Sequence, residues 1–80
     1  MISIRLVVRI TSLSPSTSSE VNVQTSESAK VRVWSSVGLL IGEYYINEGE
    51  NLLNVGNNSG LYIFEFIFEN GQRKIERIVL

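Results

Sequence analysis

The sequence of 80 residues predicts one small all-β domain, an antiparallel β-sandwich of six to seven strands with an immunoglobulin-like fold. Its composition favours strands, because nine valines, nine isoleucines and seven aromatic residues stand against one alanine and one methionine. Apolar and polar residues alternate in short runs, as in half-buried strands. These runs recur about every ten residues, with turn-forming residues and no helical pattern between them. An open barrel is the alternative architecture.

The first half of the chain predicts three strands. Residues 1–10 alternate with the apolar positions Ile2, Ile4, Leu6, Val8 and Ile10 on one face. A Ser/Thr-rich connection that contains the only proline, Pro15, follows. The next strands are expected at Glu20–Thr25 and Lys30–Trp34, with Val21, Val23, Val31 and Val33 pointing inward. Residues 1–13 are therefore a leading strand and linker, either from a preceding domain or part of the sandwich, and residues 14–80 are the domain proper.

The second half predicts four more strands, at Leu39–Ile46, Asn51–Val55, Leu61–Glu69 and Arg73–Leu80. Gly42 lies inside the first of them and indicates a bulge or a close approach of the backbone. The Asn70-Gly71 pair predicts a hairpin with a type I′ turn, which needs two residues that tolerate positive φ. The sequon Asn57-Asn58-Ser59 is interpreted as a turn between strands.

An aromatic row occupies alternate positions of the longest predicted strand. Its members are Tyr62, Phe64, Phe66 and Phe68. Such a row could stack on single-stranded nucleic acid, but that use needs interleaved basic residues, which this strand lacks. We therefore expect these rings to form the core of the sandwich.

Missing residue types exclude most catalytic chemistry. The chain has no cysteine, histidine or aspartate and a formal net charge of −1, so we expect no enzyme, no cofactor, no metal and no nucleic-acid partner. Glu48, Glu50 and Asn51 carry oxygen ligands that calcium accepts, but their pattern is not that of a calcium loop, and we expect solvated turn residues. No apolar run reaches the roughly 20 residues needed for a transmembrane segment.

An ordered set of short motifs runs along the chain. Its members are Val31-Arg32-Val33, Gly38, Gly49-Glu50-Asn51-Leu52-Leu53-Asn54-Val55, Gly60-Leu61-Tyr62-Ile63, Gly71 and Arg77-Ile78-Val79-Leu80. In order, spacing and terminal position, this set resembles the C-terminal sorting domain of type IX secretion substrates of Bacteroidetes. The resemblance covers roughly residues 14–80. It departs from the family where Ser14-Pro15-Ser16 replaces a Pro-Asn-Pro-like segment and Glu76-Arg77 replaces a lysine pair.

This resemblance implies a non-catalytic signal at the end of a larger cargo protein. The domain would fold in the periplasm and be recognised by the outer-membrane secretion machinery. A sortase-like peptidase would then remove it, leaving the cargo at the cell surface or secreted. The residues that the resemblance assigns to recognition are Gly60, Tyr62, Arg77, Ile78 and Val79, of which Gly60 and Tyr62 could act only by shaping the last hairpin.

Two further expectations concern the end of the chain. Arg73, Lys74 and Arg77 form a small basic cluster, offset by Glu76, which is either ordinary exposed strand charge or a recognition feature. Deletion of the last five residues is expected to abolish export and leave the fold largely intact. The alternative function is a stand-alone or modular immunoglobulin-like structural or adhesive domain that associates through an edge strand.

Overall fold

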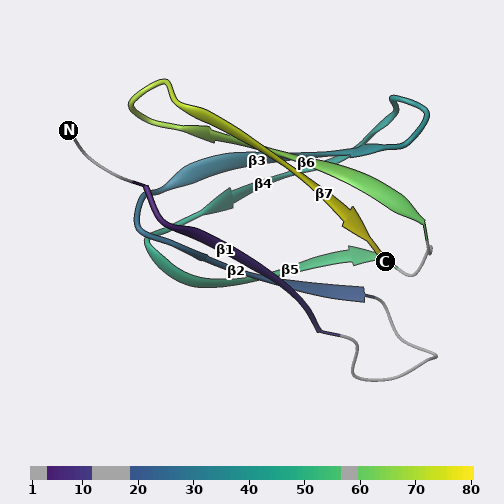
Figure 1. Ribbon diagram of the computed structural model, residues 1–80, viewed down its shortest axis with the longest axis horizontal. Coiled ribbons are helices and arrows are strands. Elements are labelled where there is room, and N and C mark those ends of the chain that lie inside the picture. Colours follow the sequence, from purple (N-terminus) through teal and green to yellow (C-terminus); the bar gives the residue numbers. More distant parts are fainter. Residues whose placement is uncertain (1–3, 12–18, 57–59) are drawn as a thin grey trace.

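A computed structural model describes residues 4–11, 19–56 and 60–80 and contains seven strands in these ranges (Figure 1). They are β1 (Leu6–Thr11), β2 (Ser19–Thr25), β3 (Ala29–Ser35), β4 (Leu40–Ile46), β5 (Gly49–Gly56), β6 (Leu61–Phe68) and β7 (Arg73–Val79). Each corresponds to a run of alternating residues in the sequence. The Pro15 connection and the sequon at residues 57–59 lie outside the described residues.

The strands form two antiparallel sheets. Sheet A has the order β1-β2-β5 and sheet B the order β4-β3-β6-β7. The two sheets lie one above the other in Figure 1, so the predicted β-sandwich is confirmed. β1 pairs with β2 along its whole length, from Leu6 opposite Thr25 to Thr11 opposite Glu20. No helix of the described residues has the length and apolar character needed to cross a membrane.

The core lies between the sheets and is built from the inward positions of the strands. Its largest fully buried side chains are Phe64, Phe66, Ile46, Val21, Val23, Val31 and Val33. The aromatic row of β6 is buried throughout, and the rings of Phe64 and Phe66 stack with centroids 6.4 Å apart. The prediction that this row forms the core is confirmed. Each buried phenylalanine contributes about 1.5–3 kcal/mol through the hydrophobic effect.

The β6–β7 turn differs from the predicted type I′ turn. Asn70 does not have positive φ, since the positive-φ residues in the described ranges are all glycines, and Gly71 has φ +90°. The amide of Gly71 donates to the Phe68 carbonyl and the amide of Phe68 donates to the Gln72 carbonyl. Three residues therefore form the loop, with Gly71 alone in the left-handed region. The Asn70 side-chain oxygen accepts a hydrogen bond from the main-chain amide of Gln72, at 2.9 Å.

Gly42 lies at the irregularity that the sequence indicates. Val33 of β3 is opposite Gly42 and Trp34 is opposite Leu40, so one residue of β4 has no partner at this point. A Cβ at Gly42 would lie 3.2 Å from the hydroxyl oxygen of Tyr44, whose ring covers this position. The predicted bulge is thus present, and the missing side chain of Gly42 leaves room for the Tyr44 ring beside the backbone.

Among the described residues, a side-chain hydrogen bond connects the two halves of the sandwich on each of its open sides. On one side the Tyr44 hydroxyl of β4 donates to the Asn54 carbonyl of β5, at 3.1 Å. On the other side the Lys74 ammonium of β7 donates to the carbonyl of Ile4, just before β1, at 3.0 Å. The edge strands of the two sheets are therefore tied together by polar contacts in addition to the core.

Candidate functional site

The β6–β7 hairpin holds all five residues predicted for recognition. The two strands are in register from Leu61 opposite Val79 to Ile67 opposite Arg73. The amides of Gly60 and Leu80 each donate to the carbonyl of the other, at 2.9 and 2.8 Å, and so close the open end of the hairpin. Gly60 has φ +141°, a conformation that favours glycine. Its part in this hairpin is therefore to let the backbone pair with the end of the chain.

The structure separates the other four residues into two pairs. Tyr62 and Ile78 are opposite each other and point inward, with 7% and 6% of their surface exposed. Arg77 and Val79 point outward, and Val79 is 68% exposed. The inward pair therefore belongs to the core, and the outward pair is accessible to a partner.

Within the part of the chain that the structure describes, β7 has a free edge because it is the last strand of sheet B. In an antiparallel ladder, hydrogen-bonded and non-hydrogen-bonded pairs alternate. Because Gly60 and Leu80 form a hydrogen-bonded pair, every second residue of β7, counted back from Val79, directs its main-chain amide and carbonyl away from β6. These residues are Arg73, Ile75, Arg77 and Val79. They also carry the outward side chains, and we call them the β7 outer row. A partner at this edge would meet free main-chain groups and this row together.

Burial at the end of β7 contradicts the expectation that the last five residues can be removed without harm to the fold. Ile78 is a core residue, Leu80 packs against the core, and the main chain of Leu80 pairs with Gly60. Their deletion would expose the cluster around Tyr62 and open the hairpin. Recognition must therefore be tested by substitutions of the outward side chains.

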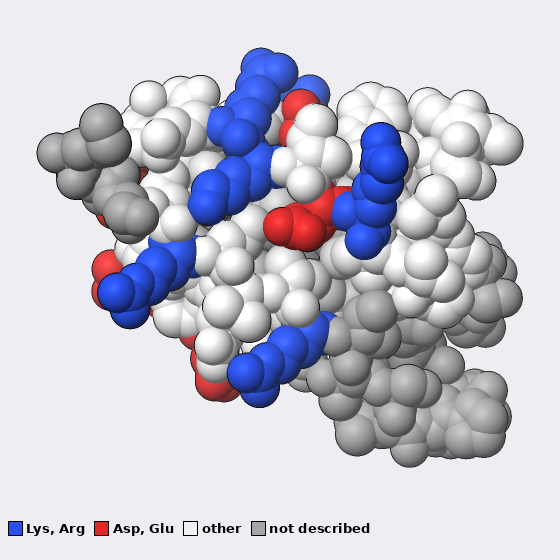
Figure 2. All heavy atoms as spheres, in the orientation of Figure 1, with Lys and Arg blue, Asp and Glu red and all other residues white. Residues whose placement is uncertain are grey.

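Basic residues gather on the side of the sandwich where β1 and β7 lie. Five of the seven basic residues belong to β1, the residue before it and β7, whereas seven of the eight glutamates lie elsewhere in the chain. β1 and β7 are the near edges of the two sheets in Figure 1, and Figure 2 shows basic side chains spread over this side. The near-zero net charge therefore conceals a locally basic surface.

The edge strands on this side share a pattern. Arg5, Val7 and Arg9 alternate along the outer face at β1, as Arg73, Ile75, Arg77 and Val79 do along β7. Arg73 lies 3.6 Å from Glu65 of β6. Within the described ranges the side chains of Arg5, Arg9 and Arg77 have no ion-pair or hydrogen-bond partner. These guanidinium groups are available to an anionic partner.

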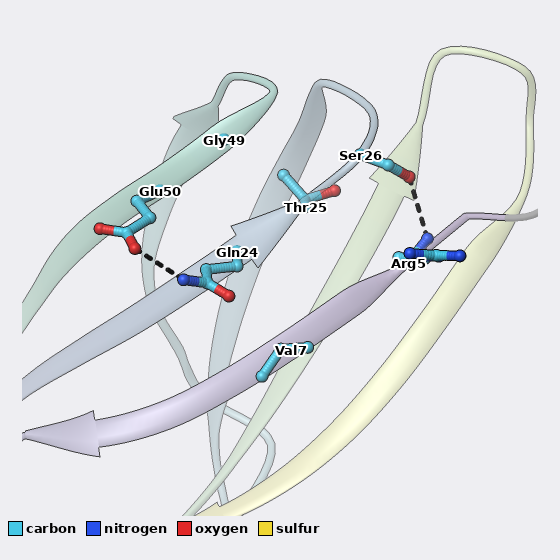
Figure 3. A pocket seen from close by; sticks show the side chains of 7 residues that line it. All are labelled: Arg5, Val7, Gln24, Thr25, Ser26, Gly49 and Glu50. Atoms are coloured by element: carbon cyan, nitrogen blue, oxygen red, sulfur yellow. Dashed lines mark hydrogen bonds between the residues drawn. The ribbon is translucent and has the colours of Figure 1, made fainter.

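A shallow hollow of about 460 Å³ lies at one end of the outer face of sheet A (Figure 3). Its lining residues are Arg5, Val7, Gln24, Thr25, Ser26, Gly49 and Glu50. Most of its polar groups bind one another: the Gln24 amide donates to Glu50 at 2.6 Å, and the Ser26 hydroxyl accepts the Arg5 main-chain amide at 2.9 Å. The hollow therefore offers few free polar groups to a small molecule.

At the turn between β4 and β5, two of the three residues that were considered for calcium, Glu50 and Asn51, accept hydrogen bonds from other protein groups. The Asn51 side chain accepts the Asn47 amide at 3.1 Å and donates to the Asn47 carbonyl at 2.7 Å, which closes the turn around Gly49. The Glu50 carboxylate accepts the bond from Gln24. Gly49, Glu50 and Asn51 thus begin β5 directly after this turn, with Gly49 at φ +106°.

No family model matches this chain, and no curated protein or solved structure matches it either.

Proposed function

We propose that this domain is a non-catalytic recognition module and that its recognised element is the outward face of β7. The observation that carries this proposal is that the side chains of the last strand point in two directions, some into the core and some to solvent. Ile78 points into the core and stabilises the fold, whereas Arg77 and Val79 point to solvent beside an unpaired strand edge. An exposed edge with projecting side chains suits the addition of a partner strand.

We further propose that recognition serves type IX secretion, with the domain acting as the C-terminal sorting signal of a larger cargo. This proposal rests on the resemblance of the ordered glycine, tyrosine and terminal arginine motifs. An immunoglobulin-like assignment accompanies it: β1-β2-β5 follow the order of strands A-B-E, and β3-β6-β7 follow that of C-F-G. The secretion machinery of the outer membrane and a sortase-like peptidase are the partners in this proposal, and the cell surface is the destination of the cargo.

An export assay tests the secretion proposal. The whole chain is fused behind a periplasmic reporter in a host that has a type IX system, and Arg77→Glu is combined with Val79→Glu. Export of the reporter should fall at least about tenfold while the urea midpoint of the isolated domain stays near that of the parent, because both side chains are exposed.

Val37→Glu is the matched control, because Val37 is 79% exposed on the β3–β4 loop, away from β7. It should leave export unchanged. Failure of the unsubstituted fusion to be exported, or full export of the double variant, would contradict the proposal.

The second candidate function is a structural or adhesive domain, and the β4 edge favours it. Leu39, Leu40, Ile41 and Tyr45 are all large apolar residues with 46–78% of their surface exposed. β4 is the other edge strand of sheet B, so these residues could mediate association between copies. Sedimentation over a hundredfold concentration range should then reveal association that Ile41→Lys abolishes, and a domain that stays monomeric throughout would exclude this function.

A further inference from the structure

We infer that the free edge of β7 binds an extended acidic polypeptide segment whose outward residues alternate between acidic and aliphatic. This inference rests on the proposed role of β7 in recognition and adds the chemistry of the partner. The segment would pair antiparallel or parallel with β7 and extend sheet B by one strand.

The main chain of β7 offers free hydrogen-bonding groups to an added strand. Arg73, Ile75, Arg77 and Val79 direct their amides and carbonyls away from β6, so an added strand finds donors and acceptors at a regular spacing. β7 is paired without irregularity from Arg73 to Val79. The β4 edge is less suitable, because the register shift at Gly42 interrupts its ladder.

The side chains of the β7 outer row determine which residues a partner strand would carry. Its two arginines are four residues apart, which corresponds to about 13 Å along a strand. Ile75 and Val79, which are 64% and 68% exposed, alternate with them. A complementary strand therefore carries acidic residues at the same spacing and aliphatic residues at the positions between them.

The basic residues on this side of the sandwich favour an acidic partner. The remaining basic residues on this side raise the local concentration of anions, and Arg77 has no partner among the described residues. A nucleic acid is the less suitable occupant, because the positions between the arginines are aliphatic and the aromatic rings of β6 are buried.

The test uses the whole domain and a fluorescent, terminally blocked peptide of two Glu-Thr-Val-Thr repeats. One comparison peptide has lysine in place of glutamate. A second has the same composition but carries its valines one residue earlier, on the opposite face from the glutamates. Saturable binding of the first peptide is expected, at least about tenfold tighter than that of either comparison peptide and weaker at high salt.

Two domain variants locate the bound peptide. Arg77→Glu should weaken binding at least about tenfold. Arg9→Glu makes the same change of charge in the similar row on β1 and should weaken binding less than about twofold. Equal losses in both variants, a larger loss in Arg9→Glu, no saturable binding up to about 1 mM peptide, or tighter binding of a single-stranded oligonucleotide would each overturn the inference.

Export and peptide binding separate the two proposals. If the fusion is exported in an Arg77-dependent manner but the peptide does not bind, the partner chemistry is wrong and the recognition role stands. If the peptide binds at β7 but the fusion is not exported, the secretion function is wrong and the peptide-binding inference stands.

Discussion

The ammonium group of Lys74 lies 3.0 Å from the carbonyl oxygen of Ile4 and joins the last strand to the segment that leads into β1. The two residues are 70 positions apart in the chain: Lys74 belongs to sheet B, and Ile4 lies two residues before the first strand of sheet A. Lys74 is half-buried, so its charged hydrogen bond is partly shielded from water. The segment that leads into the first strand and the proposed recognition strand are therefore in direct contact.

Lys74→Met should lower the free energy of unfolding by about 1 kcal/mol, because it keeps the apolar stem and removes a partly exposed charged donor. Urea denaturation measures this change, and hydrogen exchange of the β1 amides should accelerate with it. Lys30→Met is the comparison, since Lys30 pairs with the partly exposed Glu43 at 3.3 Å and lies 6.0 Å from the centroid of the Tyr45 ring, and both of these residues belong to its own sheet. A Lys74 variant as stable as the parent, with unchanged exchange in β1, would show that the contact does not hold the strand.

Tyr44→Phe removes the corresponding bond on the other side of the sandwich. The expected loss is about 0.5–1.5 kcal/mol, since the Asn54 carbonyl loses the hydroxyl donor while the ring keeps its packing. The two bonds lie on opposite sides, so the double variant with Lys74→Met should lose the sum of both effects within about 0.5 kcal/mol. Denaturant unfolding of the four proteins measures this additivity, and strong coupling would mean that the two sides are not independent.

Phe66→Ala should unfold the domain or nearly so. Phe66 is fully buried, and its truncation costs about 3–5 kcal/mol, against a total stability of about 4–12 kcal/mol for a chain of this size. Ile75→Ala, at a position 64% exposed, should cost less than about 0.5 kcal/mol. Thermal unfolding followed by circular dichroism distinguishes the two. Similar melting temperatures for both variants would contradict the assignment of inward and outward faces.

Gly71→Ala tests the geometry of the last turn. Gly71 has φ +90° and open space around the position of a Cβ, so the cost is backbone strain alone, about 1–2 kcal/mol. Asparagine tolerates this region better, and Gly71→Asn should cost less. Equilibrium unfolding of the two variants measures the difference, and an alanine variant of parental stability would contradict the three-residue loop.

Alternation in the sequence was sufficient to predict the strands and most of their faces. Val21, Val23, Val31 and Val33 alternate with polar residues, and each is buried as this pattern predicts. The turn after Phe68 was assigned incorrectly, because the Asn-Gly pair also fits a three-residue loop in which asparagine has negative φ. The choice between these loops depends on the register of β6 and β7 rather than on the pair itself.

The candidate site could be predicted only in part, because it depends on which strands become neighbours. Arg77 and Val79 are in the terminal motif, but only the burial of Ile78 separates outward from inward residues. Arg5 and Arg9 are distant in sequence from β7, and local patterns carry no information that places β1 and β7 on one side. For the same reason, the hydrogen bond between Lys74 and Ile4 could not be predicted from the sequence.

Amide hydrogen exchange of β7 tests the central claim, recognition through its free edge, most directly. In the free domain the amides of Arg73, Ile75, Arg77 and Val79 should exchange much faster than those of Lys74, Glu76 and Ile78, which face β6. With the acidic peptide at saturation, the four outer-row amides should slow by at least about tenfold. Unchanged exchange in these four amides, or slowing along β4 instead, would contradict the account.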